Sequence, residues 1–265
     1  MSALHVAIEG LGLWTPQLGN VDALRALLAG TPVAPPPTRP AAATLPANER
    51  RRAPESVLLA TEVADQAVAM SGRAASELAC VFTSSHGDQA ITDYMCATLA
   101  TAPNELSPTK FHNSVHNAPV GYWTIATGCH AASTAVCAHA LSFGAGLLEA
   151  VSLVLADQRP VLLVCSDIAG SGPLREVTGC EQSFGAAVVL APVSNASALA
   201  TLTLRLSSGR DGTAGALPEP LASVRAGNPA AGALDLLIPL LRGAAHARLA
   251  ASPSMELDLD MEYPA

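Results

Sequence analysis

The sequence predicts an α/β fold with a largely parallel central sheet. The first observation is that apolar, β-branched runs alternate with segments of helical period from the start of the chain to about residue 192. The second is that the runs at 160–167 and 184–191 are apolar almost throughout, as strands buried on both faces require. The third is composition: 50% hydrophobic and 14% charged residues in a chain of 265 can supply a sizeable core.

The elements follow in order along the chain. Residues 5–13 form an apolar run, and Asn20 is a typical N-cap for a helix over 21–28. The Pro-rich stretch 31–46 excludes a helix or a central strand and predicts a surface segment. The other expected helices are 54–71, 89–100, 131–156 and 234–241, and the other expected strands are 78–83, 120–127, 160–167, 184–191, 199–206 and 255–262.

Residues 120–130 predict a strand, a sharp turn at Gly128 and then a long Ala-rich helix. Cys129 is expected at this turn, over the amides and the positive end of the helix, a position that favours the reactive thiolate of a cysteine. Two interpretations stay open: an acyl-accepting nucleophile, or a small buried residue, because free cysteine is among the most buried residue types. His86, at the end of a predicted strand, and His130, beside the cysteine, are candidates for polar support.

Composition argues against several functions. The net charge is −8 and no basic patch with interleaved aromatic residues occurs, so nucleic acid is not an expected partner. The six cysteines form no C-x-x-C pair and no signal-peptide pattern opens the chain, which together favour reduced thiols in the cytoplasm. No uninterrupted apolar stretch predicts a membrane span. His112 and His116 lie near two asparagines without a carboxylate at ligand spacing, which favours hydrogen bonding over a metal site.

Three segments resemble β-ketoacyl synthases of the thiolase fold. Residues 10–19 resemble their opening, 125–129 the elbow that carries their acylated cysteine, and 184–190 the strand that closes their N-terminal half. Residues 111–123 and 142–150 resemble a short branch of that family, the chain-length-factor-type proteins encoded with bacterial aryl polyene and xanthomonadin-type pigment pathways.

This resemblance implies a thiolase-like layered fold in which the C-terminal half is reduced. Residues 1–192 would be the ketosynthase N-terminal-like half, and 193–265 a shortened C-terminal segment packed on the same core. Chain-elongating ketosynthases combine their cysteine with two histidines, one in a His-Gly-Thr-type loop and one near a Gly-Phe-Gly-Gly-type turn. Neither motif follows Cys129 here, and the C-terminal segment contains only His246. The enolate formed on decarboxylation therefore lacks its expected hydrogen-bond donors.

The resemblance then implies a subunit that pairs with a catalytic ketosynthase and works on chains held by an acyl carrier protein. A heterodimer is the expected form, and a homodimer is the alternative. No metal or organic cofactor is expected, because thioester chemistry needs neither. The alternative is an autonomous acyltransferase that uses Cys129, and a third interpretation is a scaffold without acyl chemistry. The residues expected to contact the partner or its acyl chain are Phe111, His112, Val115, His116, Tyr122 and Trp123.

Overall fold

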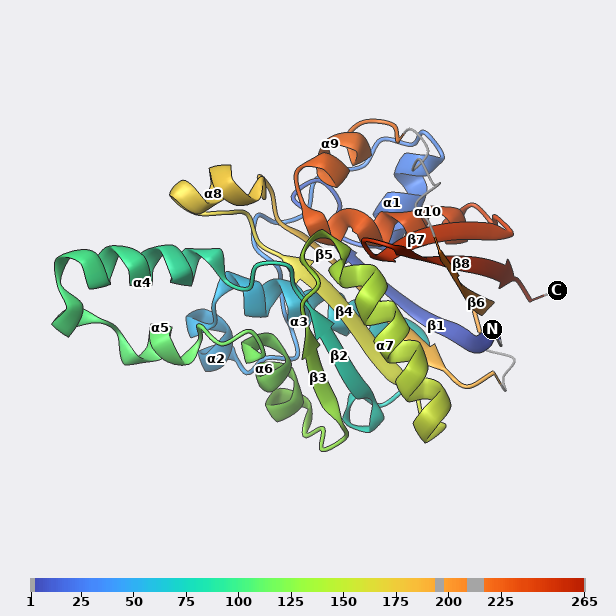
Figure 1. The fold of residues 1–265 in the computed structure, drawn as a ribbon, viewed down its shortest axis with the longest axis horizontal. Helices are drawn as coiled ribbons and strands as arrows, with labels where there is room; N and C mark the ends of the chain where they lie inside the picture. Colours follow the sequence, from blue (N-terminus) through green and yellow to red (C-terminus); the bar gives the residue numbers. More distant parts are fainter. Residues whose placement is uncertain (1–2, 194–197, 209–216, 265) are drawn as a thin grey trace.

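An eight-stranded sheet, with the strand order β3-β2-β4-β5-β1-β6-β8-β7, runs through the computed structural model, which describes residues 3–193, 198–208 and 217–264 (Figure 1). The sequence prediction of an α/β fold is confirmed. The strands are β1 (Leu4–Trp14), β2 (Ala79–Thr83), β3 (Ser133–Val136), β4 (Val161–Asp167), β5 (Phe184–Ala191), β6 (Ala200–Ser208), β7 (His246–Ser252) and β8 (Met255–Glu262).

The expectation of a largely parallel sheet is wrong. Of the seven strand pairs formed by the described residues, only β2 with β3 and β2 with β4 are parallel. Strand β5 runs antiparallel between β4 and β1, although all three are apolar along most of their length. The physical reason is that helices cover both faces of this part of the sheet, so antiparallel strands there are as fully buried as parallel ones.

Helices pack on both faces of the sheet. Helix α3 (Glu55–Ser71) covers β1, β4 and β5 on one face, together with α6 (Ala118–Thr127) over β2. Helix α7 (Ser142–Asp157) covers the other face, with α10 (Leu234–Leu241) beside it on β7. The remaining helices are α1 (Val21–Leu28), α2 (Ala47–Arg52), α4 (Gln89–Thr101), α5 (Pro108–His112), α8 (Pro173–Thr178) and α9 (Leu221–Ala226), with the 3₁₀ turns η1 (Ala75–Glu77), η2 (Pro103–Glu105), η3 (His139–Leu141) and η4 (Pro229–Ala233).

Helix α3 lies unusually close to β1 because two glycines open the strand surface. A Cβ atom at Gly10 would lie 2.0 Å from the carbonyl oxygen of Ala67, and one at Gly12 would lie 2.0 Å from that of Val63. No side chain fits there without displacing the helix backbone. These glycines therefore set the helix–sheet distance in one of the two main apolar layers.

We expect Gly12→Ala to lower the free energy of unfolding by about 1–3 kcal/mol, the usual cost of overpacking a core. Urea denaturation measures this directly. Gly121→Ala is the matched control, since a Cβ atom at Gly121 has nothing within 4 Å. It replaces a helical glycine, so it should leave stability unchanged or raise it by up to about 1 kcal/mol. Equal stability of the two variants would contradict the packing argument.

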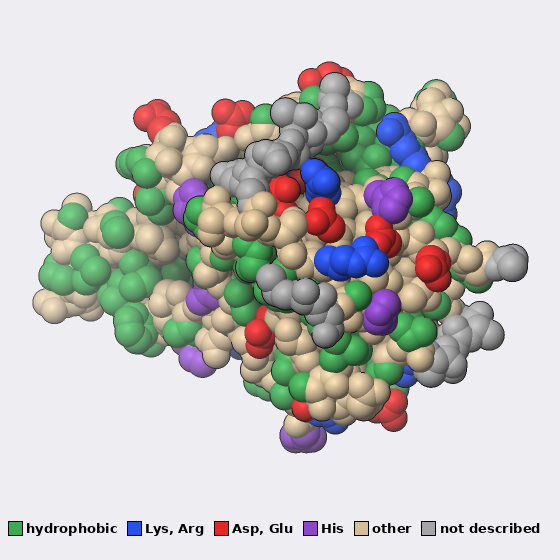
Figure 2. Space-filling model, turned by 45° about the vertical axis from the view of Figure 1, so that its right-hand side comes forward, with side chains coloured by type: hydrophobic (Ala, Val, Ile, Leu, Met, Phe, Trp, Pro, Cys, Tyr) green, Lys and Arg blue, Asp and Glu red, His purple; other side chains and the backbone are tan. Residues whose placement is uncertain are grey.

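The last three strands extend the sheet and carry a charged outer face. Strand β8 alternates buried apolar residues with acidic ones and lies between β6 and β7. Asp260 pairs with Arg205 of β6 and lies 2.5 Å from His246 of β7, and Asp258 lies 3.0 Å from Arg248. Figure 2, which brings this end of the molecule forward, shows acidic and basic side chains side by side.

One helical stretch of the described chain, His139–Asp157, is long and apolar enough by composition to cross a membrane. In the fold, 44% of the most apolar part of this stretch is buried, and α7 packs against β2 and β4. Phe143, Leu147 and Val151 belong to the main apolar cluster. The stretch therefore serves as a core helix of an α/β fold.

Two predicted elements are wrong, and both flank Cys129. Residues 120–127 form the helix α6 and not a strand, and this helix ends at Gly128, which is left-handed with φ of 63°. The helix expected over 131–156 is instead the short strand β3, the turn η3 and then α7. The other predicted strands and helices are found within a few residues of their expected bounds.

Candidate functional site

A strand–turn–helix unit with a strained residue at its turn is present, but it begins at β3 rather than around Cys129. The chain leaves β3, turns at His139 and continues through η3 directly into α7. His139 has φ of 51°, in the left-handed region that non-glycine residues rarely adopt. Nucleophile elbows place their reactive residue on such a sharp strand-to-helix turn. In this chain an imidazole occupies that position.

Two serine hydroxyls hold the strained turn. Ser85 Oγ and Ser142 Oγ each donate a hydrogen bond of 2.7 Å to the carbonyl oxygen of His139. Ser142 Oγ also accepts a 3.0 Å hydrogen bond from the backbone N–H of Ala138. A sparsely populated backbone conformation persists only where the surroundings fix it, and these bonds do so.

The carboxylate of Asp167, at the end of β4, organises the loop that faces this turn. Asp167 is buried and accepts hydrogen bonds from Ser84 Oγ at 2.6 Å, from the N–H of Ser85 at 2.9 Å and from the N–H of His86 at 3.2 Å. Burial raises the pKa of Asp167 above its ordinary value, although these hydrogen bonds act in the opposite direction. Asn228 Nδ2 donates to the backbone carbonyl of Asp167 at 2.9 Å and fixes the end of the strand.

His86 lies beside the turn. Its ring is perpendicular to that of His139, with centroids 5.3 Å apart. Burial lowers the pKa of His86; Asp167 opposes this shift and His139 adds to it, so the ring is neutral at pH 7. His116 approaches from the segment before α6, and its Nε2 donates to the carbonyl oxygen of Ser84 at 3.0 Å. His86 after β2 and His139 after β3 thus meet His116 in one loop cluster beside Asp167 at the end of β4.

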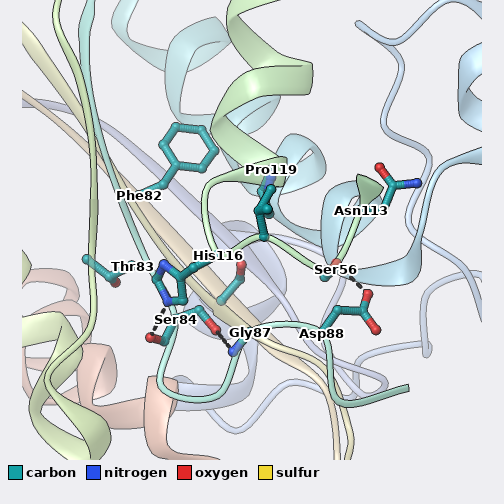
Figure 3. Close-up of a pocket in the computed structure, with 11 residues that line it drawn as sticks. Ser56, Phe82, Thr83, Ser84, Gly87, Asp88, Asn113, His116 and Pro119 are labelled. Carbon is teal, nitrogen blue, oxygen red and sulfur yellow. Dashed lines mark hydrogen bonds between the residues drawn. The ribbon is translucent and has the colours of Figure 1, made fainter. Parts of the chain in front are cut away.

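A small polar cavity lies behind this cluster (Figure 3). Figure 3 shows the His116 ring directed at Ser84 and the Ser56 hydroxyl directed at Asp88, to which it donates at 2.6 Å. The cavity volume is about 20 Å³, enough for about one water molecule and too small for an acyl group. The cavity is therefore not a site for an acyl chain.

Cys129 is not at a helix N-terminus. It follows the carboxyl end of α6, where the helix dipole is negative and does not favour a thiolate. Its side chain is 6% exposed, and Sγ donates to the carbonyl oxygen of Leu78 at 3.2 Å. Leu78 precedes β2, so Cys129 lies at the amino end of that strand. His86 and His139 lie beyond the opposite end of β2. Because β2 has five residues, the two ends of the strand are about 16 Å apart.

The geometric argument for Cys129 as the elbow nucleophile is therefore wrong. His86 lies beside His139 and does not support Cys129, and His130 is exposed beside the cysteine. The sequence signal for the true turn was available in Ser133-Thr134-Ala135-Val136, a short β-branched run followed by an apolar helix. Because the residues around this run are rich in Ala, which favours helices, a continuous helix was predicted in place of this short strand.

The six residues expected to contact a partner or acyl chain lie in different environments. Trp123 is 1% exposed and packs in the core with α3 and β2, so its side chain is unavailable to a partner; this expectation is wrong. Phe111 and Val115 are 59% and 53% exposed. His112, Val115 and Tyr122 line one apolar groove of about 510 Å³ along α6, whereas His116 faces the small polar cavity.

The matching family model is that of the β-ketoacyl synthase N-terminal domain, and it covers residues 27–237. The chain belongs to this family. No match was found among curated protein sequences.

Solved structures with the same fold include complexes of two subunits. A chain of the ketosynthase (ApeO) in complex with its chain length factor (ApeC) from Xenorhabdus doucetiae is 24% identical, with a TM-score of 0.73 over 97% of this chain and 99% of that one. A chain of AntDE:AntF, a type II PKS acyl-carrier protein in complex with its ketosynthase, is 12% identical with a TM-score of 0.77, covering 99% of this chain and 100% of that one. A chain of the ishigamide ketosynthase/chain length factor is 12% identical with a TM-score of 0.69, and the match covers 98% of this chain and 99% of that one. The expected thiolase-like ketosynthase fold is confirmed.

Proposed function

We propose that this chain is a chain-length-factor-type subunit that does not elongate chains itself. It pairs with a catalytic β-ketoacyl synthase and shapes the space for the growing acyl chain, in a pathway of the aryl polyene type. Acyl carrier protein delivers the chains, and the reaction takes place in the cytoplasm, where the six free cysteines stay reduced. Residues 1–192 supply the ketosynthase-like half, and 193–265 the shortened segment.

The observation that carries this proposal is the imidazole of His139 at the strained elbow. Acyl transfer of the ketosynthase type needs a thiolate at that turn. Here the turn, its hydrogen bonds and the following helix are all present, but the thiol is not. A subunit with an intact elbow and no nucleophile fits a partner of a catalytic subunit better than an independent enzyme.

An exposed apolar surface beside the sheet edge supports pairing. The α4–α5 arm projects from the body in Figure 1, and hydrophobic side chains gather on the corresponding projection in Figure 2. Leu99, Phe111 and Val115 of this region are more than half exposed, and Ile125 of α6 is 85% exposed. Strand β3 is the edge of the sheet and pairs only with β2 among the described strands. Exposed apolar patches and open sheet edges are typical of interaction surfaces.

We expect Ile125→Asp to weaken pairing with the catalytic ketosynthase by about 2 kcal/mol or more, as loss of an interface anchor does. Because Ile125 is exposed, the isolated subunit should keep its stability within about 0.5 kcal/mol. Co-purification with a tagged partner and sedimentation of the complex measure the effect. Val193→Asp is the matched control, since Val193 is 52% exposed just after β5, at the opposite end of the sheet from the arm. Equal affinity of the two variants would contradict the proposed surface.

Reconstitution with the partner tests the function itself. The partner alone, this chain alone and the pair are each incubated with acyl-loaded and malonyl-loaded carrier protein, and the products are identified by mass. The proposal predicts elongation only with the pair. Elongation by this chain alone would support the autonomous acyltransferase instead.

A further inference from the structure

A cleft of about 290 Å³ lies between the Pro-rich segment 31–46 and the body of the molecule. This volume is near the lower end of the range for small-molecule sites. Four parts of the chain supply its polar and ring-bearing lining, namely Trp14 at the end of β1, Asn20 at the start of α1, Glu62 of α3, and Pro36 with Arg39 of the Pro-rich segment. The cleft shares no residue with the apolar surface assigned to pairing, so it is independent of the proposed function.

The Pro-rich segment is held in a fixed position beside this cleft. Gly19 lets it approach the body, because a Cβ atom at Gly19 would lie 2.9 Å from Cβ of Pro36. Ala42 is buried and left-handed, with φ of 44°, and its N–H donates to Glu62 Oε2 at 2.8 Å. Strained non-glycine residues of this kind cluster at ligand sites, where the surroundings hold them. The cleft is therefore preformed, as small-molecule sites usually are.

Trp14 offers a hydrogen-bond donor to the cleft. The residue is only 4% exposed, yet within the described chain its indole N–H donates to no protein atom. This N–H is also not among the polar atoms that are sealed in the core without a partner, as that of Trp123 is. Because Trp14 lines the cleft and is otherwise buried, its N–H is available to a molecule that binds there. A nearly buried indole N–H usually has a partner, and a ligand with an acceptor group would supply it.

Arg39 offers a positive charge. In the described part of the chain its one hydrogen bond is a 3.4 Å contact with the carbonyl oxygen of Arg50, and it pairs with no carboxylate there. Four of the fourteen basic residues of the chain fall within residues 39–52. Although the net charge of the protein is −8, this local concentration of arginine attracts an anionic group to the cleft.

Glu62 offers the opposite chemistry. Among the described residues, its Oε1 accepts from Gln66 Nε2 at 3.0 Å and its Oε2 accepts from the N–H of Ala42. A carboxylate oxygen has two lone pairs, so each oxygen can accept a further hydrogen bond. A matching ligand therefore combines an anionic group with a hydrogen-bond donor. Trp14 and the two prolines of the lining supply flat apolar surface, which suits a planar ring.

We propose that this cleft binds a small aromatic carboxylic acid that carries an amino or hydroxyl group on its ring. Arg39 pairs with the carboxylate, Glu62 accepts a hydrogen bond from the ring substituent, and the indole N–H of Trp14 donates to an oxygen of the ligand. A hydrocarbon acyl chain would leave all three of these groups without partners, so it is not the expected occupant.

The test uses 4-aminobenzoate as the probe and the purified full-length chain. Binding is measured by calorimetry and by the indole N–H signals of a sample labelled with nitrogen-15. The chain has only two tryptophans, so Trp14→Phe assigns the Trp14 signal, and the signal of the buried Trp123 is an internal control. Arg39→Gln removes the charge from the cleft. Arg51→Gln is the matched control, because it removes the same charge from an exposed side chain of α2 that does not line the cleft.

We expect a dissociation constant below about 1 mM, with a shift of the Trp14 signal and none of the Trp123 signal. Arg39→Gln should weaken binding at least about tenfold and Trp14→Phe about three- to tenfold, whereas Arg51→Gln should leave it unchanged. The uncharged 4-aminobenzamide should also bind at least about tenfold more weakly. Absence of binding at millimolar concentrations, or equal binding by wild type and Arg39→Gln, would overturn the proposal. Equal binding of cyclohexanecarboxylate would overturn it as well, because the cleft would then not recognise a planar ring.

Discussion

Replacing His139 by cysteine is expected to turn this chain into a protein that accepts an acyl group. The elbow already has the strained turn, the two serine hydroxyls on the His139 carbonyl and the helix that starts directly after it. A thiol at this position would lie three residues before Ser142, where α7 begins, and the positive end of a helix favours a thiolate. Under the same conditions the wild-type chain should react no faster than an ordinary exposed thiol such as Cys96.

Intact mass and peptide mapping after exposure to an acyl thioester of N-acetylcysteamine measure this gain. The reference is Cys96 of α4, an exposed thiol in the same molecule. The thiol introduced by His139→Cys should be acylated at least about tenfold faster than Cys96. The experiment is repeated in a Cys137→Ala background, because Cys137 is exposed two residues before the turn. Equal rates at the two thiols would show that the turn is not an activating elbow.

The second large effect is expected at Asp167. Asp167→Ala leaves the N–H groups of Ser85 and His86 without their acceptor in a buried loop, and each unsatisfied buried donor costs about 1–3 kcal/mol. We expect a loss of about 3–5 kcal/mol in the free energy of unfolding. Asp167→Asn keeps one oxygen that accepts from Ser84 Oγ and both N–H groups, so it should cost about 1 kcal/mol.

The pH dependence of this pair of variants follows from the pKa of Asp167. Burial raises that pKa, so between its ordinary value of 3.8 and the raised value the folded state binds more protons than the unfolded state. Stability contributed by Asp167 is therefore present at low pH and is lost as the pH rises through that window. Asp167→Asn has no such titration, so its stability relative to wild type should improve as the pH rises. Urea denaturation at several pH values checks this, and a constant difference would contradict it.

The fold was predictable from the sequence wherever local signals were strong. Helix α1 begins and ends at the predicted residues, because Asn20 accepts a hydrogen bond from the N–H of Ala23 and caps it. Strand β5 also has its predicted bounds. The direction of the strands was not predictable, since an apolar run looks the same in a parallel or an antiparallel sheet that is buried on both faces.

The site was predictable only in part. Residues 120–127 contain Val, Tyr, Trp, Thr and Ile, which favour strands, yet they form α6. Two signals argued for a helix: Pro119 near its start and the left-handed Gly128 at its end. Because a strand was predicted here, the elbow was expected at Cys129, and His139 was not identified as the turn residue. His86 was identified as a polar residue at a strand end, but its neighbour His139 depends on β3, which pairs with β2 across more than 50 residues of chain.

The central claim is that this chain carries an elbow without a nucleophile. The most direct measurement is the intact mass of wild-type chain and catalytic partner, together and apart, after incubation with acyl-loaded carrier protein. Cys129→Ala serves as the control. The account predicts an acyl adduct on the partner and none on this chain. Any acyl adduct that the carrier protein leaves on this chain would contradict it, and loss of that adduct in Cys129→Ala would make Cys129 the nucleophile.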